Sequence, residues 1–189
     1  MDDLVTYSNR LIDQESEELI IQEAKRNPAK FESIYRRYYQ PIYRLILIKV
    51  RDKEICGDLV ADTWCKALHY LQIFRYSGTS IYFWIYRIAL NECNEYFRKS
   101  GRTRYVVIED YHLDRMSDEL PGVDEDNLQT LKVALKKLST SDLQYIELRF
   151  FEGLKFQEIS SIMGTNEAQC KMKVYRAIKR LKKTFIHEK

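Results

Sequence analysis

Apolar residues recur at intervals of three and four along most of this chain, a spacing that places them on one face of an α-helix. In the first hundred residues the pattern predicts helices that begin near Ser16, Pro28, Asp52 and Ser80. Pro41 falls inside the second helix and is expected to bend or divide it. The face expected to be shared in the short first helix comprises Leu19, Ile20, Glu23 and Ala24.

The last third of the chain carries the pattern of a helix-turn-helix unit. A leucine repeat over 128–138 predicts one helix, and the capping cluster at 139–142 opens another. A short helix over 156–163 is expected to end at Gly164, and Asn166 begins a long basic helix. A short helix, a turn containing glycine and a longer basic helix is the plan of DNA-binding helix-turn-helix proteins.

Between these halves the periodicity is lost and acidic residues gather. Residues 109–126 hold eight acidic side chains against Arg115 alone. The stretch is interpreted as a linker, either a self-repelling spacer or a nucleic-acid mimic that lies in a basic channel of a partner. The fold predicted is all-α, with two small helical domains joined by an acidic linker; only 105–108 has strand character. The expected ranges are a tail at 1–17, domains at 18–100 and 127–187, and the linker at 101–126.

Charge is segregated along the 189 residues, although the net charge is only +3. Residues 171–183 contain seven Lys and Arg and no acid, which favours an anionic partner for the C-terminal helix. The first ten residues are acidic and polar, unlike a signal peptide, and no apolar run is long enough to span a membrane. The four cysteines are far apart, as expected for reduced thiols in the cytoplasm.

Residue patterns typical of catalysis are missing from the sequence. There is no glycine-rich phosphate loop, no paired set of metal ligands and no catalytic triad. We therefore expect neither an enzyme nor a protein that holds a metal or cofactor.

The basic helix is the strongest candidate for a binding site. Side chains near its start are placed to reach base edges in a major groove, and those further along are placed to meet phosphates. The alternative is a solvated amphipathic helix without a partner. The candidates for duplex binding are Asn166, Gln169, Lys171, Lys173, Arg176, Lys179 and Arg180.

A second candidate is the loop at 72–79, which combines aromatic residues with Arg75. Exposed aromatic side chains beside arginine can stack on unpaired bases. The following helix adds further aromatic residues, of which Phe83 and Trp84 are equally well explained as core. The residues alone leave both interpretations open.

Four ordered motifs resemble the bacterial RNA polymerase sigma factors of the extracytoplasmic-function (ECF) group. They are FESIYRRYYQPIYRL at 31–45, DLVADTW at 58–64, FWIYRIALN at 83–91 with EYFRK at 95–99, and the helix-turn-helix that begins at Leu135. The chain departs from the family pattern at Ala61, Trp64, Glu95 and 168–170.

The resemblance implies that the first domain binds the core polymerase through the helix at 58–66. Asp58 and Asp62 are four residues apart and so share a helix face, which suits basic residues of the partner. The core-binding residues it implies are Glu54, Asp58, Leu59, Asp62, Thr63 and Lys66.

The resemblance also implies promoter recognition by both domains. The loop at 74–79 would capture a flipped base of the −10 element, the second domain would read the −35 element, and the linker would thread the polymerase channel. An anti-sigma factor is an implied partner, besides core polymerase and promoter DNA. The implied −10 contacts are Phe74, Arg75, Tyr76, Ser77, Tyr82, Tyr86, Arg87, Asn94 and Arg98.

Three other functions remain as alternatives. A stand-alone helix-turn-helix regulator would bind duplex DNA without polymerase. A sigma-like protein that only sequesters an anti-sigma factor is kept open by departures such as Ala61 and Ala168. An enzyme such as a nuclease ranks last, because the sequence has no metal-ligand constellation.

Overall fold

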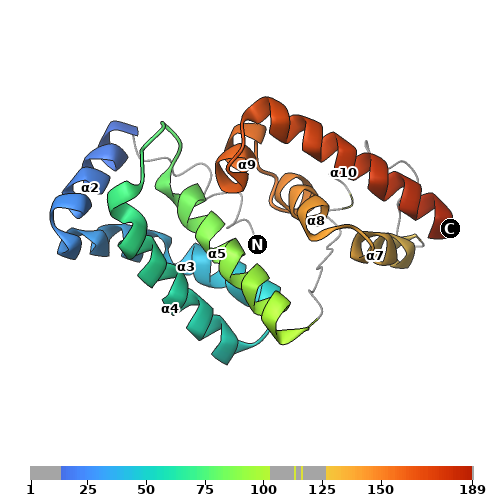
Figure 1. Ribbon diagram of the computed structural model, residues 1–189, viewed down its shortest axis with the longest axis horizontal. Helices are drawn as coiled ribbons and strands as arrows, with labels where there is room; N and C mark the ends of the chain where they lie inside the picture. Colours follow the sequence, from blue (N-terminus) through green and yellow to red (C-terminus); the bar gives the residue numbers. More distant parts are fainter. Residues whose placement is uncertain (1–13, 103–112, 114–115, 117–126, 189) are drawn as a thin grey trace. The chain divides into compact units, whose positions relative to one another are not determined.

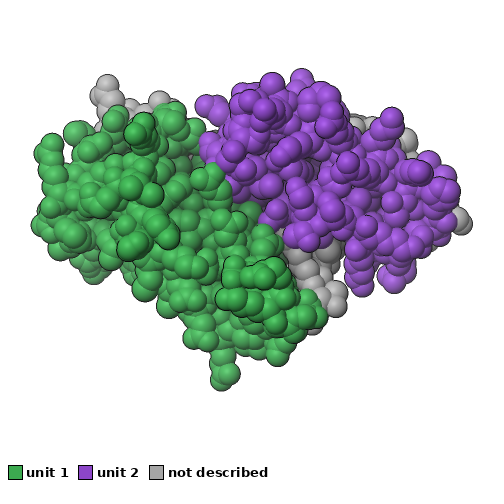
Figure 2. All heavy atoms as spheres, viewed as in Figure 1, with its two compact units in different colours: residues 1–105 green, residues 106–189 purple. Residues whose placement is uncertain are grey.

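The computed structural model describes residues 14–102, 113, 116 and 127–188 (Figure 1). Over these residues the chain is helical and forms no strand, so the predicted all-α fold is confirmed. The chain divides into two compact units, residues 1–105 and 106–189 (Figure 2). The predicted linker at 101–126, with its strand-like stretch at 105–108, lies almost wholly outside the described residues, as does most of the tail at 1–17.

In unit 1 the helices α3, α4 and α5 pack against one another, and α2 lies on α3 (Figure 1). The interface is built from aliphatic side chains at helical spacing, such as Ile42, Ile46, Ile81, Ile85 and Ala89, all of which are fully buried. The elements are α2 (Gln14–Arg26), a 3₁₀ turn (Pro28–Lys30), α3 (Phe31–Val50), α4 (Lys53–Tyr70), a 3₁₀ turn (Leu71–Ile73) and α5 (Ile81–Ser100).

Three of the four helix starts predicted in unit 1 carry a side-chain cap. Asn27 accepts a hydrogen bond from the Ala29 amide at 3.1 Å, which satisfies one of the free donors of the first turn. The Asp52 carboxylate accepts from the Glu54 amide at 3.0 Å. The Ser80 hydroxyl accepts from the Tyr82 amide at 3.2 Å and so opens α5.

Pro41 was expected to bend or divide its helix, and the division does not occur. The helix α3 runs unbroken over Phe31–Val50 with Pro41 buried inside it, because packing against α4 and α5 outweighs the one lost hydrogen bond. The prediction for α2 is wrong. The buried face of α2 is made by Glu17, Ile21 and Ala24, whereas Leu19 is 66% exposed. That face includes a carboxylate, which an apolar pattern does not reveal.

In unit 2 the long helix α10 packs along α7, α8 and α9 (Figure 1). Its buried stripe of Cys170, Val174, Ala177 and Leu181 meets fully buried residues of the shorter helices. None of the described helices of the chain has the length and apolar content that crossing a membrane requires. The elements are α7 (Leu128–Lys136), α8 (Thr140–Ile146), a π-helical turn (Glu147–Phe151), α9 (Phe156–Met163) and α10 (Glu167–Glu188).

The turn between α9 and α10 has the predicted chemistry. Gly164 ends α9 with φ 63°, a left-handed conformation that costs glycine little. Two residues later the Asn166 side chain accepts a hydrogen bond from the Gln169 amide at 2.8 Å and caps α10. This turn sets the direction in which α10 leaves α9.

Candidate nucleic-acid interface

The outer side of α4 carries an acidic face made by Glu54, Asp58 and Asp62. All three carboxylates are exposed, and Asp58 and Asp62 share one side of the helix as the four-residue spacing predicts. Thr63 and Leu59 do not belong to it. Thr63 is fully buried and donates a hydrogen bond to the Leu59 carbonyl at 2.7 Å, and Leu59 is itself buried in the packing of α4. The burial of these two side chains corrects their assignment as contact residues.

Lys66 lies one helical turn beyond Asp62 on α4, and its positive charge is paired within the protein. Its ammonium group lies 2.6 Å from both carboxylate oxygens of Glu92 on α5. This hydrogen bond raises the pKa of Lys66. The pair joins α4 to α5, and the exposed surface beside it therefore stays acidic.

The aromatic loop, residues 74–80, connects the end of α4 to α5. The ring of Phe74 packs on Trp84, with 4.8 Å between the ring centroids. Phe74 and Tyr76 are half-buried, whereas Arg75 and Ser77 are exposed. The loop thus has partly exposed aromatic rings next to the exposed side chains of Arg75 and Ser77. Such rings can stack on a base, and the arginine and hydroxyl can form hydrogen bonds with its edge.

The predicted −10 contacts on α5 are not equally accessible. Tyr82, Arg87 and Asn94 are half-buried, and Arg98 is exposed but donates a hydrogen bond to Glu95 at 3.1 Å. Tyr86 is only 2% exposed. It follows Ile85 on the helix and falls within the buried arc, which corrects its assignment to the surface.

The exposed side of α10, with the helix start at Asn166, holds all seven predicted duplex contacts. At 100° per residue, Lys171 and Lys173 lie at opposite edges of this surface, with Arg176 and Lys179 between them. A helix in a major groove needs cations at both edges, because phosphates line both walls.

Two of these cations have partners within unit 2. Arg180 donates to the Asp142 carboxylate at 2.6 Å, which ties α10 to the start of α8. The Lys173 ammonium lies 5.6 Å from the ring centroid of Tyr145, within the range of a cation–π contact. Lys171, Arg176 and Lys179 therefore carry most of the basic character available to a ligand.

At the start of α10, two side chains that could read bases are oriented by the helix cap. Asn166 accepts from the Gln169 amide, and the Thr165 hydroxyl donates to the Gln169 side-chain oxygen at 2.7 Å. These bonds occupy both side-chain oxygens. They leave the amide NH₂ groups of Asn166 and Gln169 as the donors for acceptors on base edges.

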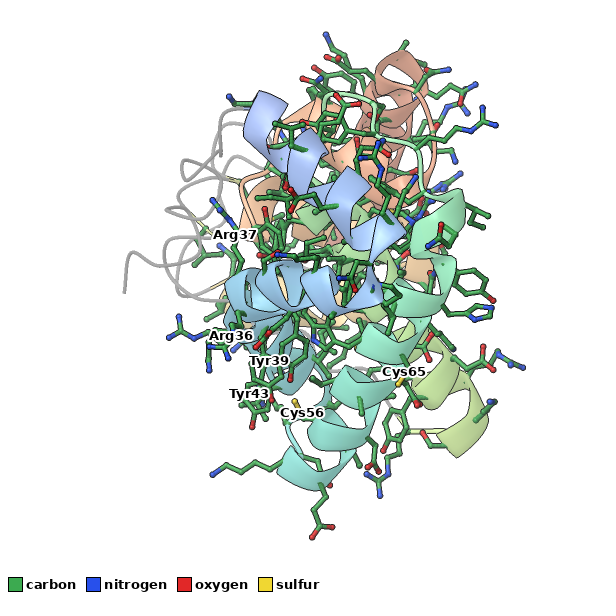
Figure 3. The ribbon with its side chains drawn as sticks, turned by 90° about the vertical axis from the view of Figure 1, so that its left-hand side faces the viewer. Arg36, Arg37, Tyr39, Tyr43, Cys56 and Cys65 are labelled. Atoms are coloured by element: carbon green, nitrogen blue, oxygen red, sulfur yellow. The ribbon has the colours of Figure 1, made fainter. Side chains whose placement is uncertain are left out.

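Two features of unit 1 were not predicted. Tyr35, Tyr39 and Tyr43 form a ladder along α3, with centroid separations of 5.1 and 6.0 Å, and Figure 3 shows Tyr39 and Tyr43 on the same side as Arg36. Their four-residue spacing could have revealed this. The second feature is a pair of hydrogen bonds between α2 and the aromatic loop, which no local pattern signals. The Ser80 hydroxyl donates to the Glu17 carboxylate, and the Lys25 ammonium donates to the Phe74 carbonyl.

Comparison with known protein families identifies the family of the chain that carries these surfaces. Residues 34–103 match the family described as Sigma-70 region 2, and residues 128–181 match Sigma-70, region 4. RNA polymerase sigma factor SigV of Bacillus subtilis is 33% identical over 74% of this chain and 81% of its own length. The chain belongs to the ECF group of RNA polymerase sigma factors.

Other relatives agree with this membership. ECF RNA polymerase sigma factor BldN of Streptomyces coelicolor is 31% identical over 80% of this chain, which spans 58% of the length of BldN. Among solved structures, the sigma factor RpoE of Bartonella quintana, crystallised in complex with the anti-sigma factor NepR, superposes with a TM-score of 0.50. That match has 23% identity over 82% of this chain and 95% of the other, and it shows a shared fold.

Within this sigma factor the two kinds of surface are divided between the regions. The acidic face of α4 and the aromatic loop lie in region 2, and the basic helix α10 lies in region 4. Region 2 therefore has two surfaces, and region 4 has one, whose chemistry suits a macromolecular partner.

Proposed function

We propose that this sigma factor binds core RNA polymerase, directs it to promoters with particular −10 and −35 elements, and helps to open the DNA. The observation that carries the proposal is the presence, in one chain, of an acidic helix face and an aromatic loop in one unit and of a basic helix-turn-helix in the other. A stand-alone regulator has no use for the first two surfaces.

Region 2 would hold the polymerase and the melted strand. Asp58 and Asp62, supported by Glu54, would pair with basic residues of the core enzyme, and Lys66 would act indirectly by holding α4 against α5. The aromatic loop would take a flipped base of the −10 element through Arg75 and Ser77 and the accessible parts of Phe74 and Tyr76. On α5, Tyr82, Arg87, Asn94 and Arg98 would contact the upstream strand and its phosphates.

Region 4 would read the −35 element as duplex. Asn166 and Gln169 would face base edges, while Lys171, Lys173, Arg176 and Lys179 would bind phosphates on both walls of the groove. We assign residues 18–100 to the region 2 domain, 101–126 to the linker through the polymerase channel, and 127–187 to the region 4 domain.

The chain would contribute specificity and strand capture and no catalysis of its own, since the polymerase performs the chemistry. Its site of action would be the bacterial cytoplasm. We further propose that an anti-sigma factor restrains it, supported by the complex in which the related RpoE was solved.

Duplex binding with and without core polymerase tests this function against that of a stand-alone regulator. The free protein is expected to bind promoter duplex weakly and the complex with core to bind it tightly, because region 2 gains its role only on the polymerase. Tight binding of the free protein to a palindromic site, unaffected by core, would refute the proposal.

A further inference from the structure

We propose that α2 is a positioning element for the aromatic loop, and that Glu17 and Lys25 are its positioning residues. The loop lies beside α2 (Figure 1). Polar side chains join the two segments at both ends of the loop. This inference rests on the proposed function, because a fixed loop shape matters for promoter opening only if the loop takes up an unpaired base.

The first contact holds the start of the loop. The Lys25 ammonium donates a hydrogen bond to the Phe74 carbonyl at 2.5 Å, and the Gln72 side chain donates to the Lys25 carbonyl at 2.8 Å. Because α2 donates one hydrogen bond to this segment and accepts one from it, the peptide plane after Phe74 is held in place. The Phe74 ring then packs on Trp84, and Arg75 is left exposed.

The second contact holds the end of the loop. Glu17 is 5% exposed, and one of its carboxylate oxygens accepts from the Tyr38 hydroxyl at 2.7 Å and from the Ser80 hydroxyl at 2.8 Å. Ser80 is the residue whose hydroxyl caps α5 by accepting from the Tyr82 amide. A buried carboxylate at the N-terminal end of a helix is stabilised by the helix dipole and by the two hydroxyl donors.

Between these anchors the side chain of Tyr76 is directed toward α2. Its hydroxyl is buried and has no hydrogen-bond partner among the residues that the structure describes. Burial raises the pKa of Tyr76, and the nearby carboxylates of Glu17 and Glu18 raise it further. Phe74 and Tyr76 thus face the protein while Arg75 and Ser77 face outward, which is the alternation of a loop with a defined shape.

A loop that is already ordered does not lose conformational entropy when it captures a base. If the contact of Lys25 or of Glu17 were removed, the loop would have to become ordered when it binds the base, and binding would be weaker. Binding of core polymerase depends on α4 and binding of duplex depends on α10, so neither should change. A loss of base capture with unchanged binding of core polymerase and duplex DNA would therefore distinguish a positioning role from general destabilisation of the protein.

Fluorescence of Trp84 tests the order of the loop without any DNA. The chain has two tryptophans, so Trp64→Phe leaves Trp84, in contact with Phe74, as the single reporter. In this background Lys25→Ala and Glu17→Gln should increase the quenching of Trp84 by acrylamide. The matched controls Arg26→Ala and Glu23→Gln change exposed residues on the same helix and should leave the quenching unchanged.

Strand capture is then measured with the full chain bound to core polymerase. The probe is a single-stranded oligonucleotide carrying the non-template −10 element of a promoter that the wild type transcribes. Lys25→Ala should weaken its binding roughly tenfold, which corresponds to the loss of one charged hydrogen bond. Lys25→Arg keeps a donor for the Phe74 carbonyl and should restore binding.

Two results would overturn the inference. One is wild-type quenching and wild-type strand binding in both Lys25→Ala and Glu17→Gln. The other is a loss of strand binding matched by an equal loss of core binding and a lower melting temperature, which would make α2 a purely structural helix. Because the quenching experiment contains neither DNA nor polymerase, it reports on the loop even if the proposed function proved wrong.

Discussion

Several cations on the candidate surfaces are paired within the protein. Lys66 bonds Glu92, Arg98 bonds Glu95, and Arg180 bonds Asp142. A paired cation has less charge to offer a phosphate, since it must leave one anion to meet another. The number of basic residues on a helix therefore overstates the number of phosphate contacts that it makes.

The salt dependence of −35 duplex binding should separate free from paired cations. Lys171→Ala is expected to lower the slope of log affinity against log salt by about one, the value for one phosphate contact. Arg180→Ala should lower it by clearly less, because Asp142 already neutralises that charge. Equal changes in slope for the two variants would show that the ion pair opens on DNA.

Charge reversal tests the acidic face of α4. Asp58→Arg with Asp62→Arg should weaken core binding by more than about tenfold, since each substitution replaces an attraction by a repulsion. Both side chains are exposed, so the melting temperature should hardly change. The matched control, Glu23→Arg with Glu32→Arg, alters exposed acids elsewhere in unit 1. An interface at α4 is excluded if both double variants bind core equally well.

Cysteine reactivity gives a test of the same face without disturbing its charges. Of the four cysteines only Cys65, three residues after Asp62 on α4, is exposed. Burial raises the pKa of Cys170 to about 11, and it also raises the pKa of Cys56, so these thiols stay protonated and shielded at neutral pH. One thiol should react with a maleimide in the native protein, and core polymerase should protect it. Undiminished labelling in the complex would place α4 outside the interface.

Single residues are also where prediction from sequence is least secure. The spacing of Asp58 and Asp62 is enough to predict that they share one face of α4. The burial of Leu59, Thr63 and Tyr86 cannot be predicted in this way, because a periodic pattern locates a buried arc only to within about one residue, or 100° of rotation. The bonds of Glu17 with Tyr38 and Ser80 join residues far apart in the sequence and have no local signal at all.

At the level of elements, helix ends are well encoded. The caps at Asn27, Asp52 and Ser80 and the stop at Gly164 were all predicted, because each depends on a side chain or a glycine at the helix end itself. The buried face of α2 was predicted wrongly because its neighbours, and not its own pattern, decide which side is covered. Local chemistry sets where a helix begins and ends, and tertiary packing sets how it is rotated.

The turn before α10 provides a prediction at this scale. Gly164→Ala should destabilise unit 2 by about 1 kcal/mol, because a Cβ disfavours the left-handed conformation at φ 63°. Gly164→Asn should cost less, since asparagine tolerates that region better. Thermal unfolding measures both. If alanine and asparagine proved equally harmless, the turn would not depend on this backbone conformation.

At the scale of the whole molecule, the chain consists of two helical units that carry different surfaces. The all-α fold and the two-unit plan were predicted, because hydrophobic periodicity and its interruption are properties of long segments and tolerate local errors. The relative placement of the units was not predicted, since the segment between them has an acidic composition and no pattern that defines a geometry. Joint action on one promoter is what the proposed function requires of them.

Run-off transcription tests that joint action most directly. Bacterial core polymerase would be incubated with a pool of genomic promoter fragments, with and without this protein. We expect transcripts that appear only when the protein is present, from promoters that share both a −35 and a −10 element. Core binding without any protein-dependent transcript would contradict it and favour a protein that only sequesters an anti-sigma factor.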